Sequence, residues 1–173
     1  MSTSNPKPDL DDVRKLDQLI RDVKFAMLTT RNANCELVSR PLTTLEVDFN
    51  GALWFMVAAD SQFVRELEDD PEINLAYASP EHGKFVSVSG IGRILRDPEK
   101  ARQLWNVAAS VWVPQGPDDP NLAVLEVDVT KAEYWDTPGG TVQRLIGFAK
   151  AKLTGDTSGL GEHRTVEVAG TRL

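Results

Sequence analysis

Arg40 and Ser61 are residues of the right type, in the right positions, to hold an anion together. Arg40 belongs to the run Ser39-Arg40-Pro41-Leu42, which has strand-like composition, and Ser61 opens a predicted helix directly after an apolar strand. The first backbone N–H groups of a helix have no partner within it, and a nearby guanidinium adds charged donors, so a phosphate suits such a place. From the residues alone, Arg40 could equally pair with Glu46 or Asp48, and Ser61 could serve only as a helix N-cap.

The other residue types that often carry chemistry do not form a recognisable site. His82 is predicted in a turn, and His163 lies near the C-terminus. Together with the single Cys35, these histidines do not give the spacing of a metal site. No general acid, base or nucleophile can be assigned from the pattern, so the catalytic residues stay unknown. The acidic run from Glu66 to Asp70 is predicted to be a solvated helix end without a functional role.

Composition limits the class of protein. With 173 residues, 41% hydrophobic and 26% charged, the chain is predicted to be one globular domain with a sizeable core. A formal net charge of -7 argues against a general nucleic-acid binder, which needs a basic face. The N-terminal residues lack the apolar core of a signal peptide, and the longest apolar run, 52–59, is too short for a membrane helix. We therefore expect a cytoplasmic protein that binds neither nucleic acid nor membrane.

Hydrophobic periodicity and turn signals predict a mainly β chain. Asn50-Gly51, between two strand-like runs, is a strong signal for a tight hairpin. Glycines inside the long predicted strand 84–95 indicate a bulge, a bend or a close approach of another group. The predicted strands cover residues 23–30, 37–47, 52–58, 73–79, 84–95 and 122–129, and the predicted helices cover 9–22, 61–70 and 97–110.

Six or seven short strands with short helices between them predict an antiparallel barrel. Residues 132–135 either continue the sixth strand or begin a seventh, and residues 141–152 are ambiguous between strand and helix. Residues 1–8 are predicted to be disordered, residues 9–155 to form the domain, and residues 156–173 to be a flexible C-terminal tail.

Four motifs follow one another in a specific order. They are Ser-Arg-Pro-Leu at 39–42, Asp-Ser at 60–61 after an aromatic strand, Val-Ser-Val-Ser-Gly at 86–90 and Glu-Tyr-Trp-Asp at 133–136. Over roughly residues 16–155, this order resembles the pyridoxamine 5′-phosphate oxidase-like flavoproteins, and among them the short general-stress proteins that bind FMN. The resemblance implies a mainly β (α+β), antiparallel split β-barrel that forms a homodimer with FMN at its interface. FAD or a deazaflavin are alternative cofactors.

The resemblance also implies roles for individual residues. Arg40 would contact the FMN phosphate, and Ser61 with the adjacent Gln62 would complete the phosphate site. Trp135 would reach the flavin from the partner subunit, and Trp112, in a loop rich in proline and glycine, is predicted to pack on that partner. The contacts predicted along the flavin ring come from two neighbouring strands and are Pro41, Leu42, Thr43, Met56 and Val57.

Two departures from the family pattern bear on function. Gln62 and Phe63 stand where the family has two basic residues after the serine, which removes positive charge from the predicted phosphate site. The Arg-Leu-His-Asp-Arg run with which the oxidases grip their substrate is also missing after Trp135. An ungapped match places Thr141 and Gln143 at its arginine and histidine. Oxidation of pyridoxamine phosphate is therefore not expected.

The sequence thus predicts an FMN-binding stress-response flavoprotein. The first hypothesis is an oxidoreductase that passes electrons from a reduced nicotinamide through FMN to a small acceptor of unknown identity. A flavin-binding protein that sequesters flavin without turnover is the second. A dimeric interaction barrel that has lost flavin is the third.

Overall fold

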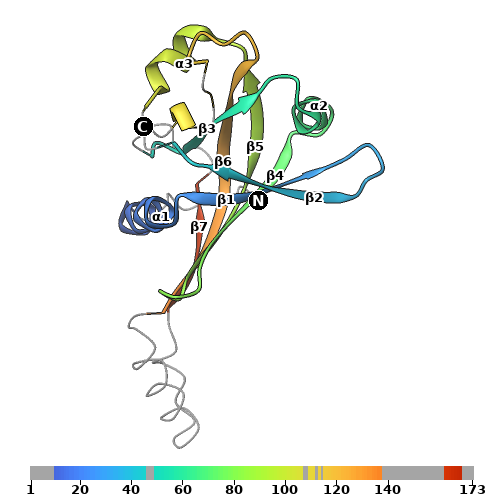
Figure 1. The fold of residues 1–173 in the computed structure, drawn as a ribbon. Helices are drawn as coiled ribbons and strands as arrows, with labels where there is room; N and C mark the ends of the chain where they lie inside the picture. Colours follow the sequence, from blue (N-terminus) through green and yellow to red (C-terminus); the bar gives the residue numbers. More distant parts are fainter. Residues whose placement is uncertain are drawn as a thin grey trace, which may run out of the picture.

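The computed structural model describes residues 10–45, 49–106, 109–111, 113, 115–137 and 162–168. Within these residues lies one antiparallel sheet of seven strands with three α-helices (Figure 1), so the predicted fold class is confirmed. The strands are β1 (Phe25–Arg31), β2 (Leu37–Thr43), β3 (Ala52–Ala58), β4 (Glu72–Ser79), β5 (Lys84–Leu95), β6 (Leu122–Asp136) and β7 (Glu162–Glu167). The helices are α1 (Leu10–Val23), α2 (Gln62–Asp69), α3 (Pro98–Leu104) and the short 3-10 helix η1 (Ala109–Val111).

The sheet is open and has the arrangement of a split barrel. Its strand order is β2-β1-β4-β5-β6-β3, and β7 also pairs with β6. The long strand β6 pairs along one edge with β5, while β3 and β7 share its other edge (Figure 1). The strands at the two ends of this order, β2 and β3, approach each other just after β2 ends. There the Leu45 N–H donates to the Trp54 carbonyl at 2.9 Å. Among the described residues, β2 and β3 form no ladder, since β2 pairs with β1 and β3 pairs with β6. The tight hairpin predicted around Asn50-Gly51 is therefore wrong.

Strand β7 corrects one expectation from the sequence. Residues 162–167 fall in the segment predicted to be a flexible tail, yet all six pair with residues of β6. Val166 and Val168 are buried in the core. Apart from these two valines, the segment is polar, so the alternation of apolar and polar residues that indicates a strand is weak here. The pairing with β6, distant in sequence, stabilises it.

Helix α3 begins as predicted but ends early. The Asp97 carboxylate caps it by accepting from the N–H groups of Glu99 and Lys100. The predicted helix extended to Ser110, whereas α3 stops at Leu104 and Trp105 is its half-buried C-cap. Residues 132–135, left open in the sequence, continue β6.

Gly90 lies where the backbones of β5 and β6 approach each other closely. The register between β5 and β6 shifts between Ser89 and Gly90, as expected for a bulge. A Cβ atom added at Gly90 would lie 2.6 Å from the backbone oxygen of Asp128. The glycine is therefore required by a close backbone approach, as its place in a long strand predicted.

The two faces of the sheet differ sharply. On the inner face, Leu28, Leu75 and Val88 are completely buried, because α1 and α2 pack over them. The outer face carries the alternate side chains of the same strands. We define its apolar part by four exposed residues: Phe25, Met27, Phe85 and Trp135. None of the described helices has the length and apolarity needed to cross a membrane.

Candidate functional site

Arg40 lies on the inner side of β2 and ties the sheet edge to α2. Its Nη1 donates to Thr30 Oγ1 at 2.6 Å, and its Nη2 donates to Glu66 Oε2 at 3.2 Å. The guanidinium carbon also lies 5.0 Å from the centre of the Phe63 ring. Thr30 belongs to β1, and Phe63 and Glu66 belong to α2. The predicted anion ligand is thus present but already partnered.

Glu66 is the centre of this cluster and corrects the sequence interpretation. Its Oε2 also accepts from Thr30 Oγ1 at 2.7 Å, and its Oε1 accepts from Gln62 Nε2 at 3.1 Å. The residue is only 8% exposed, so the prediction of a solvated acidic run is wrong for it. Helical spacing explains this, since residue 66 shares the buried side of α2 with Phe63 and Leu67. Arg40 does pair with an acid, but Glu46 and Asp48, the candidates from the sequence, lie outside the described residues.

Ser61 occupies the N-cap position of α2 without capping it through its side chain. Its backbone is extended, and no hydrogen bond joins its hydroxyl to the helix. Among the described residues, Ser61 Oγ is the buried side-chain oxygen or nitrogen without a hydrogen-bond partner. A buried hydroxyl of this kind is rare and requires an explanation. A free hydroxyl, the N–H groups that begin an eight-residue helix, and the nearby guanidinium form a donor set that fits a phosphate.

A cavity of about 270 Å³ adjoins this cluster along the free edge of β2. Its size is close to the lower end of the range for small-molecule sites, about 300 Å³. The walls are mainly apolar, with a few polar groups from the start of β1 and the segment after α3. The lining residues are Lys24, Phe25, Pro41, Leu42, Thr43, Thr44, Leu45, Met56, Asn106 and Ala109.

The wall of the cavity is fixed by buried hydrogen bonds. Thr44 Oγ1 and Tyr77 Oη lie 2.9 Å apart, and the Thr44 N–H donates to the Lys24 carbonyl at 2.9 Å. Burial raises the pKa of the Tyr77 phenol above its ordinary value, and the hydrogen bond to Thr44 opposes this only in part. Tyr77 therefore stays protonated over the physiological range, and the Thr44 wall is held by a neutral contact.

The structure groups the predicted site residues into two neighbouring sets. Pro41, Leu42, Thr43 and Met56 line the cavity, whereas the Val57 side chain turns into the core because neighbours on a strand face opposite ways. Arg40, Ser61 and Gln62 belong to the other set, around Glu66 and the start of α2. Trp112 lies outside the described residues.

The two sets are continuous along the chain. Arg40 directly precedes Pro41 on β2, and the segment after Met56 leads through the end of β3 to Ser61. The cluster and the cavity are therefore neighbours along β2, although none of the cluster residues lines the cavity.

Trp135 lies on the outer face, away from the cavity of its own chain. It faces Phe85 across β5 and β6. Phe85 pairs with Ala78 of β4, and Phe25 lies beside Ala78, because the preceding pair along β1 and β4 is Ala26 with Tyr77. Three strand spacings of about 4.8 Å separate β1 from β6, which places Trp135 about 14 Å from Phe25 at the cavity wall. Within one chain, the predicted flavin tryptophan and the predicted ring site are thus apart.

His163 is a residue that the sequence interpretation missed. It pairs with Trp135 across β6 and β7, and the two rings stack with their centres 4.8 Å apart. Its Nε2 lies 3.7 Å from a carboxylate oxygen of Glu133. The weak alternation around Val166 was the only local signal for this strand. The contact could not be anticipated, because it depends on pairing between segments about thirty residues apart.

Comparison with known proteins gives a consistent result. The model of a family described as "Pyridoxamine 5'-phosphate oxidase like" matches residues 11–159. The protein bli-3 of Neurospora crassa is 27% identical over an alignment of 175 positions, which covers 91% of this chain and 84% of bli-3.

Solved structures agree with the family match. A protein assigned to general stress protein 26 from Jannaschia aligns with a TM-score of 0.72 and 25% identity, covering 92% of this chain and 99% of that one. The general stress FMN/FAD binding protein of Xanthomonas citri aligns with a TM-score of 0.64 and 29% identity, covering 73% of this chain and 89% of that one. The family match spans both the Arg40 cluster and the cavity-lining strands, and the chain belongs to the pyridoxamine 5′-phosphate oxidase-like family.

Proposed function

We propose that this chain is a stress-response flavoprotein that binds FMN along the edge of β2. The observation that carries the proposal is the continuity of two features on one strand. Arg40 and the start of α2 offer donors for a phosphate, and the next three residues of β2 line an apolar cavity suited to a ring. Ser61 would donate its otherwise partnerless buried hydroxyl to the phosphate. The FMN/FAD-binding description of the Xanthomonas relative supports the same assignment.

We further propose that two copies of the chain pack through their outer faces. Phe25 belongs both to the cavity wall and to the exposed apolar row, so a second copy seated there would cover the cavity. Apolar side chains gathered on one sheet face are typical of an interaction surface. Trp135, which is far from the cavity of its own chain, would then lie near that of the partner. FAD or a deazaflavin in place of FMN is tested by the same binding assay.

Bound FMN would supply hydride and electron transfer. The chain itself would bind and orient the ring between β2 and Met56, with Lys24 and Asn106 as the polar groups of the wall. The partner's outer face would exclude water. We propose a reduced nicotinamide as the electron donor and a small molecule as the acceptor.

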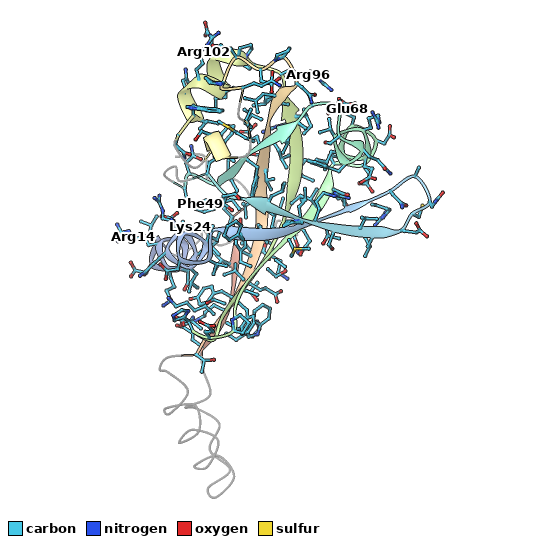
Figure 2. The ribbon with its side chains drawn as sticks, viewed as in Figure 1. Arg14, Lys24, Phe49, Glu68, Arg96 and Arg102 are labelled. Atoms are coloured by element: carbon cyan, nitrogen blue, oxygen red, sulfur yellow. The ribbon has the colours of Figure 1, made fainter. Side chains whose placement is uncertain are left out.

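FMN titration of the purified protein tests the binding site. We expect Arg40→Ala to weaken FMN binding by about 1.5–3 kcal/mol, the usual effect of losing a charge-assisted contact. Arg102→Ala is the matched control, because Arg102 is exposed on α3 (Figure 2) and pairs with the surface residue Asp118. Because Arg40→Ala also removes a hydrogen-bond donor to the buried Glu66, Arg40→Gln, whose neutral amide is still a donor, is measured as well. Unchanged affinity in both variants would remove Arg40 from the site.

The rate of NADH or NADPH oxidation separates an enzyme from a carrier. The FMN-loaded protein is expected to oxidise NADH or NADPH faster than free FMN at equal concentration, because a positioned ring and the exclusion of solvent favour hydride transfer. A rate no greater than that of free FMN, with binding intact, would favour the flavin-sequestering alternative.

A further inference from the structure

We propose that Glu66 sets how strongly this site discriminates between phosphorylated and unphosphorylated flavin, by holding down its affinity for the phosphate. The proposal rests on the flavin binding proposed above and concerns this chain's own charge at the phosphate end. It makes Glu66 a specificity-determining residue.

The charges of the cluster cancel before any ligand arrives. Arg40 is its cation and Glu66 its anion, joined at 3.2 Å, and Gln62 contributes an uncharged amide. Glu66 is 8% exposed, and the side chain of Arg40 is 21% exposed, so water screens the pair poorly. A phosphate must therefore share the guanidinium with a carboxylate and lie close to that like charge. An unphosphorylated flavin meets neither effect.

The neighbours of Glu66 allow its charge to be removed without disturbing the network. Thr30 and Arg40 both donate to Oε2, and Gln62 donates to Oε1. In Glu66→Gln, the amide oxygen can take the place of Oε2 and accept the hydrogen bonds from Thr30 and Arg40. The new NH₂ group can donate to the Gln62 amide after that amide flips, since the two ends of an amide have similar shape. The variant is therefore isosteric, keeps every contact and gives the cluster one net positive charge.

The experiment measures dissociation constants for FMN and riboflavin in the wild type, in Glu66→Gln and in Glu68→Gln. Glu68 is the matched control: it lies two residues further along α2, undergoes the same charge change, and points outward to Arg96 at 2.9 Å (Figure 2). We expect Glu66→Gln to bind FMN about tenfold more tightly, as the loss of one nearby like charge implies. Its affinity for riboflavin should be unchanged, and Glu68→Gln should match the wild type for both flavins.

Three results would overturn the proposal. They are an equal change in affinity for both flavins, weaker FMN binding by Glu66→Gln, and an equal gain in Glu68→Gln. The wild type gives a second test that does not depend on a variant folding. An unrestrained contact between a phosphate and a guanidinium favours FMN over riboflavin by about ten- to 150-fold. A wild-type preference above that range would contradict the proposal, and a preference below it supports the proposal. Failure of the proposed function looks different, because then the wild type binds neither flavin.

Discussion

The inner and outer faces of the sheet use the same strands for opposite purposes. On β1, Leu28 is fully buried against the helices, while its neighbour Met27 is 43% exposed on the other face. On β6, Tyr134 is buried and its neighbour Trp135 is exposed. The inner face is complete within one chain and accounts for folding. On the outer face, α3 covers Trp54 and Val124. Among the described residues, the apolar row of Phe25, Met27, Phe85 and Trp135 stays exposed, and this is the part that we propose a second copy covers.

The proposed site lies where the two faces meet. On β2, Arg40 points to the inner side and reaches α2, and Pro41 beside it is exposed. Because β2 is an edge strand, no neighbouring strand covers its free edge, and groups from both faces of the sheet are accessible there. The proposed phosphate end is accordingly hydrogen-bonded within the chain, whereas the proposed ring end opens toward the outer face.

The largest expected effect separates the faces by stability. Leu28→Ala should lower the free energy of unfolding by about 2–5 kcal/mol, because it opens a cavity in the packed inner face. Met27→Ala, one residue away, should change it by no more than about 0.5 kcal/mol in the monomer. Denaturant unfolding at a protein concentration low enough to avoid self-association measures both. Equal losses would show that the outer face also stabilises the single chain.

The next effect concerns self-association. Phe85→Glu places a charge in the middle of the outer apolar row and should raise the dimer dissociation constant by at least about tenfold, since a buried unpaired charge is costly. Sedimentation velocity measures the change, and Gln103→Glu, which adds the same charge to an exposed position on α3, is the control. If the partner covers the cavity, FMN affinity should fall together with dimerisation. A dimer that survives Phe85→Glu would place the interface elsewhere.

Local patterns predicted most of the fold. Strands β3 and β5 have the bounds that the sequence predicted, since each combines a continuous or alternating apolar run with clear turn residues at both ends. Strand β7 was missed because its six residues include a single buried one, and its stability comes from pairing with β6. Local composition carries no information about such a distant pairing.

The candidate site could be predicted only in outline. The position of Arg40 on a strand and of Ser61 before a helix followed from neighbouring residues. The partner of Arg40 did not, because Glu66 lies 26 positions away and its burial depends on how α2 is turned against the sheet. The acidic residues around Glu66 made it look solvated. Charge pairing between elements distant in sequence is therefore the part of the site that local sequence patterns do not predict.

The last prediction uses the pair Tyr134 and Trp135, whose effect is confined to alkaline pH. Burial, with the Asp12 carboxylate nearby, raises the pKa of Tyr134 to about 12. The unfolded chain therefore loses this proton near pH 10, while the folded chain keeps it up to about pH 12. The stability that this difference contributes is complete below pH 10 and is lost as the pH rises through that window.

Tyr77, the other tyrosine, is shifted in the same direction, so each should contribute about 1.4 kcal/mol per pH unit to the fall in unfolding free energy. Tyr134→Phe should halve the tyrosine part of this slope, and Trp135→Phe, on the outer face, should leave it unchanged. Urea unfolding of both variants between pH 9 and about 12 measures the slopes, and the difference from the wild type cancels the lysines, which ionise in the same range. A slope that Tyr134→Phe does not alter would mean that water reaches the phenol. The inner face would then be less closed at α1 than the contact between Tyr134 and Asp12 implies.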